Sequence, residues 1–213
     1  MSYRHTYYFC GDFLEDKRLK TGTTTVGLVT KDSVVLAADM RASMGHLAYD
    51  EEVNKIYKIA DNVALTIAGS VGDALTLVRF LRSHAKLFEI ERETKITPKA
   101  IATFASNILN SNRFYPFYVQ FIIGGINQKP ELFDVDPSGG LLERKQFAVT
   151  GSGTELAMSV LDQNYNENLS TEQGIELAVR AVKASKKRDI YSGGIAVKVT
   201  VIDKNGVKET QQN

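Results

Sequence analysis

A glycine followed by three threonines, at residues 22–25, contains the residue types in this chain that most directly suggest chemistry. If the Gly22–Thr23 bond is cut, Thr23 begins the strand expected over residues 24–30 and carries a hydroxyl and a free α-amine together. The threonine methyl restricts χ1, and an α-amine with an ordinary pKa of about 7.7–8.0 can accept the hydroxyl proton near neutral pH. Because Gly22 has no Cβ, it tolerates the strained backbone that brings this hydroxyl onto its carbonyl. These residues predict an N-terminal nucleophile, whereas simple strand packing is the alternative role for Thr23.

Four further residues lie at or near the ends of expected strands, where they could meet Thr23. Asp39 ends the strand 34–39 and Arg41 comes just after it, Lys55 precedes the strand 56–59, and Gly69 follows the strand 63–67. Each also has an ordinary explanation, because aspartate and glycine commonly end strands and most lysines lie on the surface. The residues alone leave both interpretations open.

The elements that must position these residues follow the order strands, two helices, strands, two helices, strand. This order matches neither a strict βαβ alternation nor an all-β chain, so it predicts two antiparallel sheets face to face with a helix pair over each outer side, an α+β four-layer αββα sandwich. A loop is expected over residues 42–52, and Asn205-Gly206 predicts a type I′ turn before a short tail. The remaining expected strands are 118–124, 131–136, 146–150 and 195–202. The expected helices are 72–91, one opening at Thr97-Pro98, 154–164, and 170–187 with a Ser170/Gln173 capping box.

Six segments, in order and at compatible spacing, resemble the β subunits of the proteasome core particle, most closely the archaeal ones. The resemblance runs from about residue 23 to residue 201 and implies the same αββα sandwich, the fold of N-terminal nucleophile hydrolases. The six segments are residues 22–27, 37–43, 54–55, 68–73, 151–153 and 188–194.

The resemblance implies a catalytic role for each candidate. The Lys55 cation would favour deprotonation of the Thr23 hydroxyl and disfavour a second positive charge on the amine, while Asp39 would keep Lys55 charged. The Gly69 N–H would point at the developing oxyanion. Three residues would form a supporting shell around the Thr23 amine, although helix and loop capping would also explain them. They are Ser152, Asp189 and Ser192.

Substrate contacts are also implied by the resemblance. Four apolar residues fall near positions that line the pocket for the side chain preceding the cut, so the expected preference is for cleavage after hydrophobic residues. Core packing would equally explain two of them, Ile67 and Val71. Ser43 would bind an extended substrate through backbone hydrogen bonds. The four apolar positions are Ala42, Val53, Ile67 and Val71.

The same resemblance predicts the domains and partners. Residues 1–22 would be a propeptide removed on maturation, and 23–213 a single catalytic domain acting on polypeptides. Other β subunits would complete a heptameric ring, with α-type subunits in outer rings and a regulatory ATPase on the particle. The only cysteine, Cys10, lies in the leader, so the mature chain would have no disulfide or thiolate site, which suits a reducing cytoplasm.

Composition narrows the function classes. With 26 Lys and Arg against 25 Asp and Glu, no charge excess points to nucleic acid or to an anionic membrane as partner. The apolar runs are strand-sized, far below the roughly 20 residues of a membrane span. The 3 histidines are scattered and no metal or phosphate-binding motif is present, so no cofactor is expected.

The remaining alternative is a β-type ring subunit that keeps its leader and has only a structural role. An α-type subunit is disfavoured because it would lack the set of Thr23, Lys55 and Asp39.

Overall fold

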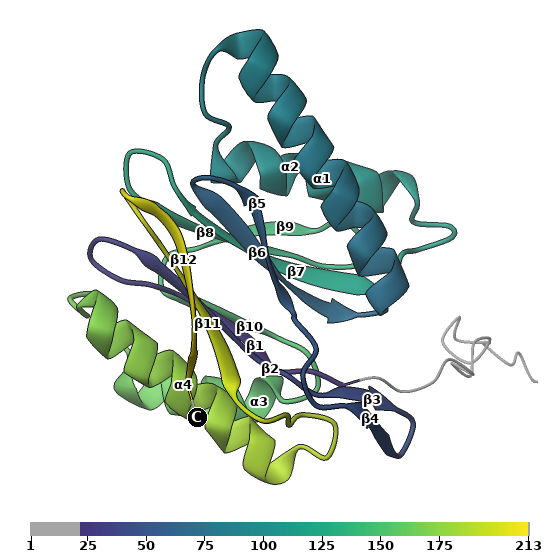
Figure 1. Cartoon of the computed structure of the whole chain (residues 1–213), viewed down its shortest axis with the longest axis vertical. Coiled ribbons are helices and arrows are strands. Elements are labelled where there is room, and N and C mark those ends of the chain that lie inside the picture. Colours follow the sequence, from purple (N-terminus) through teal and green to yellow (C-terminus); the bar gives the residue numbers. More distant parts are fainter. Residues whose placement is uncertain (1–21, 213) are drawn as a thin grey trace, which may run out of the picture.

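The computed structural model describes residues 22–212 and arranges them in four layers, which Figure 1 shows from the side. Two five-stranded antiparallel sheets face each other, and a pair of helices covers the outer side of each. The predicted α+β αββα sandwich is confirmed. Residues 1–21 of the leader, which include its cysteine, lie outside the described residues.

The first sheet has the strand order β10-β1-β2-β11-β12 and is covered by α3 and α4. All its neighbouring strands are antiparallel, and β1 lies opposite β10 with Thr25 facing Thr150. The bounds are β1 (Thr25–Val29), β2 (Val34–Asp39), β10 (Phe147–Thr150), β11 (Val197–Asp203), β12 (Gly206–Gln212), α3 (Thr154–Asn164) and α4 (Thr171–Arg188).

The second sheet has the order β5-β6-β7-β8-β9 and is covered by α1 and α2. Its strands run antiparallel to their neighbours throughout. The bounds are β5 (Ile56–Ala60), β6 (Val63–Gly69), β7 (Val119–Ile126), β8 (Pro130–Val135), β9 (Leu141–Arg144), α1 (Val71–Arg92) and α2 (Pro98–Ser111).

Side-chain caps fix where three of the helices begin. Thr97 precedes α2, and its hydroxyl accepts from the Ala100 N–H. Ser70 precedes α1, and its hydroxyl accepts from the Asp73 N–H. Ser170 and Gln173 form both hydrogen bonds of the predicted capping box. Each cap satisfies donors that the first helical turn leaves without partners.

The apolar core has three layers, one beneath each helix pair and one between the sheets. All six residues of β2 are buried, because α4 covers one face of this strand and the second sheet covers the other. This accounts for the continuous apolar run in the sequence, where an ordinary half-buried strand would alternate.

The segment 42–52, expected to be a loop, instead contains a small β-hairpin. Its strands are β3 (Ala42–Met44) and β4 (Leu47–Asp50), which pair with each other beside the sandwich. The loop prediction was wrong because β4 is exposed throughout, so no buried face produced an apolar pattern.

The end of the chain also differs from expectation. The predicted tail is the seven-residue strand β12, and the type I′ turn is wrong because Gly206, at φ +113°, has positive φ and Asn205 does not. Strand β9 was missed, since its four residues are partly or largely exposed. Lys186, in the last turn of α4, donates from Nζ to the carbonyls of Gly194 and Ala196.

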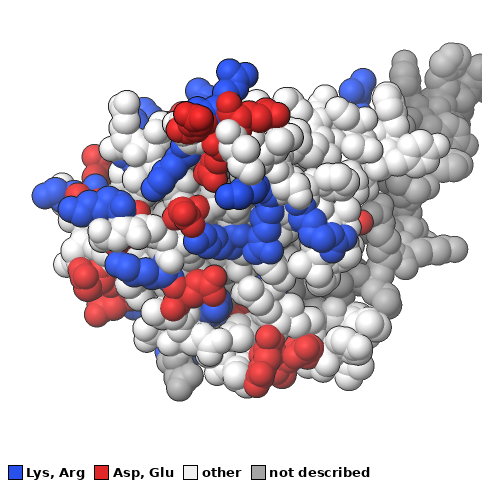
Figure 2. Space-filling model, turned by 45° about the horizontal axis from the view of Figure 1, so that its top comes forward, with Lys and Arg blue, Asp and Glu red and all other residues white. Residues whose placement is uncertain are grey.

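The surface carries both signs of charge. On the face in Figure 2, which brings the end bearing α1 and α2 forward, basic and acidic side chains are interspersed. None of the helices within residues 22–212 combines the length and apolar character needed to cross a bilayer.

Candidate active site

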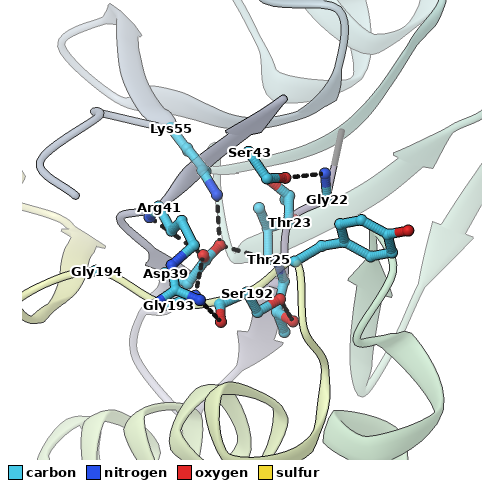
Figure 3. A network of polar contacts seen from close by, with 12 residues as sticks. Gly22, Thr23, Thr25, Asp39, Arg41, Ser43, Lys55, Ser192, Gly193 and Gly194 are labelled. Carbon is cyan, nitrogen blue, oxygen red and sulfur yellow. Dashed lines mark hydrogen bonds and ion pairs between the residues drawn. The ribbon is translucent and has the colours of Figure 1, made fainter. Parts of the chain in front are cut away.

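Gly22 and Thr23 lead directly into β1 and are both buried. The Gly22 N–H donates to Ser43 Oγ at 2.9 Å, and the Thr23 N–H donates to Ser152 Oγ at 3.1 Å. Figure 3 shows Ser43 reaching toward Gly22 from the β3–β4 hairpin. Hydroxyls from two distant segments thus hold the N–H groups of the two residues that share the Gly22–Thr23 peptide bond.

A buried ion pair lies beside Thr23. Lys55 Nζ donates to Asp39 Oδ1 at 2.6 Å, and the two residues are 4% and 0% exposed. Asp39 ends β2 and Lys55 immediately precedes β5, so the pair joins the two sheets. Burial lowers the pKa of Lys55 below its ordinary 10.5, and the nearby Asp39 carboxylate opposes that shift.

Backbone donors satisfy the remaining lone pairs of the Asp39 carboxylate. The Thr24 N–H donates to Oδ1 at 2.9 Å and the Gly193 N–H donates to Oδ2 at 2.8 Å. A buried carboxylate is tolerated when it is both paired and hydrogen-bonded in this way. The arrangement fixes the position of the Lys55 ammonium.

A chain of hydroxyls runs along the other side of Thr23. Ser152 Oγ donates to Asp189 Oδ2 at 2.6 Å, and the Ser192 hydroxyl donates to the same carboxylate oxygen. Since the single proton of Ser192 is used there, the 2.7 Å contact between its Oγ and Thr24 Oγ1 has Thr24 as the donor. This chain orients Ser152, which accepts from the Thr23 N–H.

Arg41 joins the β3–β4 hairpin to the segment that follows α4. Its Nε donates to Glu51 Oε1 at 3.1 Å, while a Cβ on Gly193 would come within 2.3 Å of its guanidinium carbon. The guanidinium therefore packs directly on Gly193, whose N–H holds Asp39. A side chain at Gly193 would displace this contact.

Gly69 ends β6 in a conformation that only glycine adopts readily. Its φ is +116°, and a Cβ there would lie 2.2 Å from the Tyr118 carbonyl oxygen. Gly69 and Thr23 both line two separate cavities, so they mark the boundary between them.

The smaller cavity, of about 40 Å³, contains every residue that the sequence associated with substrate. Lys55, Gly22 and Arg41 also line it. The five expected substrate residues found together there are Ala42, Ser43, Val53, Ile67 and Val71.

The second cavity, of about 300 Å³, lies on the other side of Thr23 and was not anticipated. Chain segments far apart in the sequence form it. Its lining includes Tyr118, Val119, Gln120, Pro137, Gly151 and Ser152.

The structure thus brings the seven expected catalytic residues to one end of the sandwich, and the sequence missed three of their partners. Thr24, Tyr191 and Gly193 contact the site through hydrogen bonds or close packing. Thr24 and Gly193 belong to the motifs at residues 22–27 and 188–194, but no local pattern shows which atoms they meet. Within the described part of the chain, no group of three or more His, Cys, Asp or Glu side chains could hold a metal ion.

Comparison with known proteins identifies the family to which the chain is similar. The family model described as "Proteasome subunit" matches residues 19–202. The chain is 51% identical over 189 residues to "Proteasome subunit beta" of Methanocaldococcus fervens, covering 88% of this chain and 84% of that protein. It is 47% identical over 190 residues to "Proteasome subunit beta 1" of Pyrococcus furiosus, covering 89% and 96%. For "Proteasome subunit beta 1" of Thermococcus kodakarensis, identity is 46% over 182 residues, covering 85% and 89%.

Proposed function

The chain belongs to the proteasome subunit family as a β-type member, and from this premise we propose that it is a threonine endopeptidase made as an inactive precursor. Thr23 is the nucleophile, and residues 1–22 are the propeptide. The observation that carries the proposal is the buried Lys55–Asp39 ion pair, because its lysine lines one cavity together with Thr23.

Leader removal is the first reaction. The Thr23 hydroxyl oxygen attacks the Gly22 carbonyl carbon, the new ester bond forms as the Gly22–Thr23 amide bond breaks, and the hydroxyl proton ends on the released α-nitrogen. Water then hydrolyses the ester, which leaves a carboxylate on Gly22 and a free α-amine on Thr23. Ser43 and Ser152 hold the N–H groups on both residues, so the peptide is fixed before attack.

Peptide cleavage uses the same atoms. The free α-amine of Thr23 accepts the hydroxyl proton as the oxygen attacks a substrate carbonyl, then gives that proton to the departing amine. The Lys55 ammonium favours the deprotonated oxygen and disfavours a second cation on the amine, while Asp39 holds Lys55 in place. The Gly69 N–H stabilises the oxyanion, where losing one such donor costs about 2.7–4 kcal/mol in other hydrolases. Water hydrolyses the resulting acyl ester.

The small cavity suits an apolar side chain preceding the cut. Three of the five expected substrate residues lining it are branched aliphatics, Val53, Ile67 and Val71, and Ala42 adds a methyl group. These four residues exclude water from an aliphatic or aromatic side chain, which favours its burial there. Cleavage after hydrophobic residues follows, with Ser43 binding the extended backbone beside it.

As a family member the chain assembles with other proteasome subunits in rings. The finer arrangement proposed is a heptameric β ring stacked on α-type subunits, with a regulatory ATPase at the end of a cytoplasmic particle. Enclosure suits a hydrolase that shows no motif for selecting folded proteins, because it limits cutting to unfolded chains that are fed inside.

The intact mass of the assembled chain tests the proposal. Wild type should lose residues 1–22 and cleave peptides, whereas Thr23→Ala should keep its leader and be inactive. A wild-type particle that keeps Met1 and has no peptidase activity would instead favour the structural role, and one that keeps Met1 while active would rule out Thr23 as the nucleophile. Sedimentation checks assembly, since a fully active monomer contradicts the need for a ring.

A further inference from the structure

Three threonine hydroxyls form a hydrogen-bonded group in the layer between the two sheets. Thr25 Oγ1 lies 2.6 Å from Thr150 Oγ1 and 2.9 Å from Thr66 Oγ1. The exposed fractions of these three residues are 0% for Thr25 and Thr66 and 3% for Thr150. Thr25 and Thr150 are directly opposite each other in the first sheet, but Thr66 belongs to the second sheet, so one of these bonds crosses the sandwich.

Each member of this threonine group lies two or three residues from a residue of the candidate active site. On β1, Thr25 follows Thr23 by two positions. On β10, Thr150 precedes Ser152 by two, and on β6, Thr66 precedes Gly69 by three. The threonine group therefore joins three strands close to the site. These strands lead to the nucleophile Thr23, to Ser152, which accepts from the Thr23 N–H, and to Gly69, the expected oxyanion donor.

Packing alone does not account for these hydroxyls. Valine has nearly the same shape as threonine, and replacing both partners of a buried hydrogen bond by apolar groups of the same shape can be nearly neutral or stabilising. The hydrophobic members of the layer between the sheets are aliphatic, with Leu36, Ile122 and Leu132 among them. Aliphatic contacts have no preferred direction, whereas a hydrogen bond fixes both distance and angle.

We propose that the bond between Thr25 and Thr66 positions the Thr23 nucleophile relative to Gly69 across the sandwich. These two threonines are positioning residues, because neither lines either cavity beside Thr23. The bond fixes the position of β1 relative to β6 in the facing sheet. The bond from Thr25 to Thr150 fixes β1 relative to β10, the strand that leads into Ser152. The inference rests on the proposed function, since it assigns these hydroxyls to the reaction at Thr23.

The test is Thr66→Val in the assembled particle of full-length chain. This change removes the bond between the sheets, together with the 3.3 Å bond that Thr66 Oγ1 accepts from the Ile122 N–H, but it leaves Thr25 its partner Thr150, so no hydroxyl of the group is stranded. We expect kcat for a peptide substrate to fall roughly 10- to 100-fold, because a misplacement of about 1 Å can cost about 100-fold in rate, with KM within about twofold of wild type. Thr66→Ser, which keeps the hydroxyl, should restore most of the rate.

The chain supplies a matched control in Thr200 on β11. Thr200 is also 0% exposed, but its hydroxyl has no hydrogen-bond partner among the described residues. Thr200→Val therefore makes the same change of side chain at an equally buried position, and it should leave kcat at the wild-type value. The thermal unfolding midpoint of both variants should equal or exceed that of wild type. A loss of kcat would then reflect misplacement of the site and not unfolding of the chain.

The outcomes distinguish this inference from the proposed function. If wild type is active and Thr66→Val has the same kcat, the inference is overturned while the proposed function stands. If Thr66→Val and Thr200→Val lose the same activity, the effect belongs to buried threonines in general and the inference is again overturned. If Thr23→Ala retains wild-type activity, the proposed function fails and takes the inference with it.

Discussion

Gly22 lies so close to Tyr191 that a Cβ on Gly22 would come within 1.8 Å of the Tyr191 Cβ. It would also approach Ser152 Oγ to 2.7 Å. Real side chains do not tolerate a contact this short, so either the backbone around Tyr191 moves or the Gly22 peptide does. The residue before the expected cut is therefore limited to glycine by its surroundings as well as by its own backbone freedom.

Gly22→Ala should accordingly block leader removal, because the displaced carbonyl no longer meets the Thr23 hydroxyl. Intact mass of the assembled chain, followed over time, measures the retained fraction. Gly72→Ala is the control, since a Cβ at this exposed position in α1 would meet nothing within 4 Å. Leader removal at the wild-type rate in Gly22→Ala would show that Tyr191 does not restrict the site.

Ser43→Ala should slow leader removal more than it slows peptide cleavage. The Ser43 hydroxyl accepts from the Gly22 N–H at 2.9 Å, and Gly22 is present only before the cut. Losing one such hydrogen bond corresponds to about 0.5–1.5 kcal/mol, or roughly a 2- to 13-fold slower step.

The measurement for Ser43 compares two preparations. One begins at Met1 and reports leader removal; the other begins at Thr23, released from a removable fusion, and reports peptide cleavage alone. Ser43→Thr keeps the hydroxyl and should restore leader removal. Equal losses in both preparations would assign Ser43 to substrate binding in general.

Lys55→Ala should abolish both leader removal and peptide cleavage. Without the ammonium, the Thr23 hydroxyl is harder to deprotonate and the amine is less available as a neutral base, so the rate should fall roughly 10²- to 10⁴-fold. Lys55→Arg should restore little, because a planar guanidinium does not fit the place of a compact ammonium 2.6 Å from Asp39.

The preparation that begins at Thr23 removes the dependence of peptide cleavage on leader removal. Lys58→Ala serves as control, since its lysine forms an exposed pair with Asp61 three residues away. If Lys55→Ala particles assemble and cleave peptides near the wild-type rate, Lys55 is structural and the assignment of the site is wrong.

The titration of Lys55 should affect rate and stability in opposite directions as pH rises. Burial lowers the pKa of Lys55 below 10.5. If the ammonium is the active form, kcat should fall as pH rises through that lowered pKa, before an ordinary lysine would lose its proton. A rate that stays constant up to an ordinary lysine pKa would contradict this.

Stability should rise over the same interval. Between the lowered pKa and 10.5 the unfolded chain holds a proton on Lys55 that the folded chain has released, so the Lys55 contribution to the free energy of unfolding increases with pH. Denaturant unfolding of wild type and Lys55→Met at several pH values isolates this contribution, because the variant should lack it.

Local signals in the sequence determined a large part of this molecule. The spacing of apolar residues and the capping residues predicted the four helices. They also predicted both hydrogen bonds of the Ser170 and Gln173 capping box, because these interactions form within one turn of chain. Local apolar runs likewise predicted β1 and β2, whose residues are buried nearly throughout. The order of elements then determined the sandwich, since two sheets and two helix pairs leave few other ways to bury every apolar face.

Only the tertiary structure decided which atoms meet at the site. The sequence supplied Thr23, Asp39 and Lys55 as residue types, but nothing local predicts that Gly193 donates to Asp39 or that Arg41 packs on Gly193. The β3–β4 hairpin escaped prediction because an exposed strand has no apolar pattern. The bond from Thr25 to Thr66 escaped it because threonine in a strand normally indicates packing, and a hydrogen bond between two sheets depends on how close those sheets come after folding.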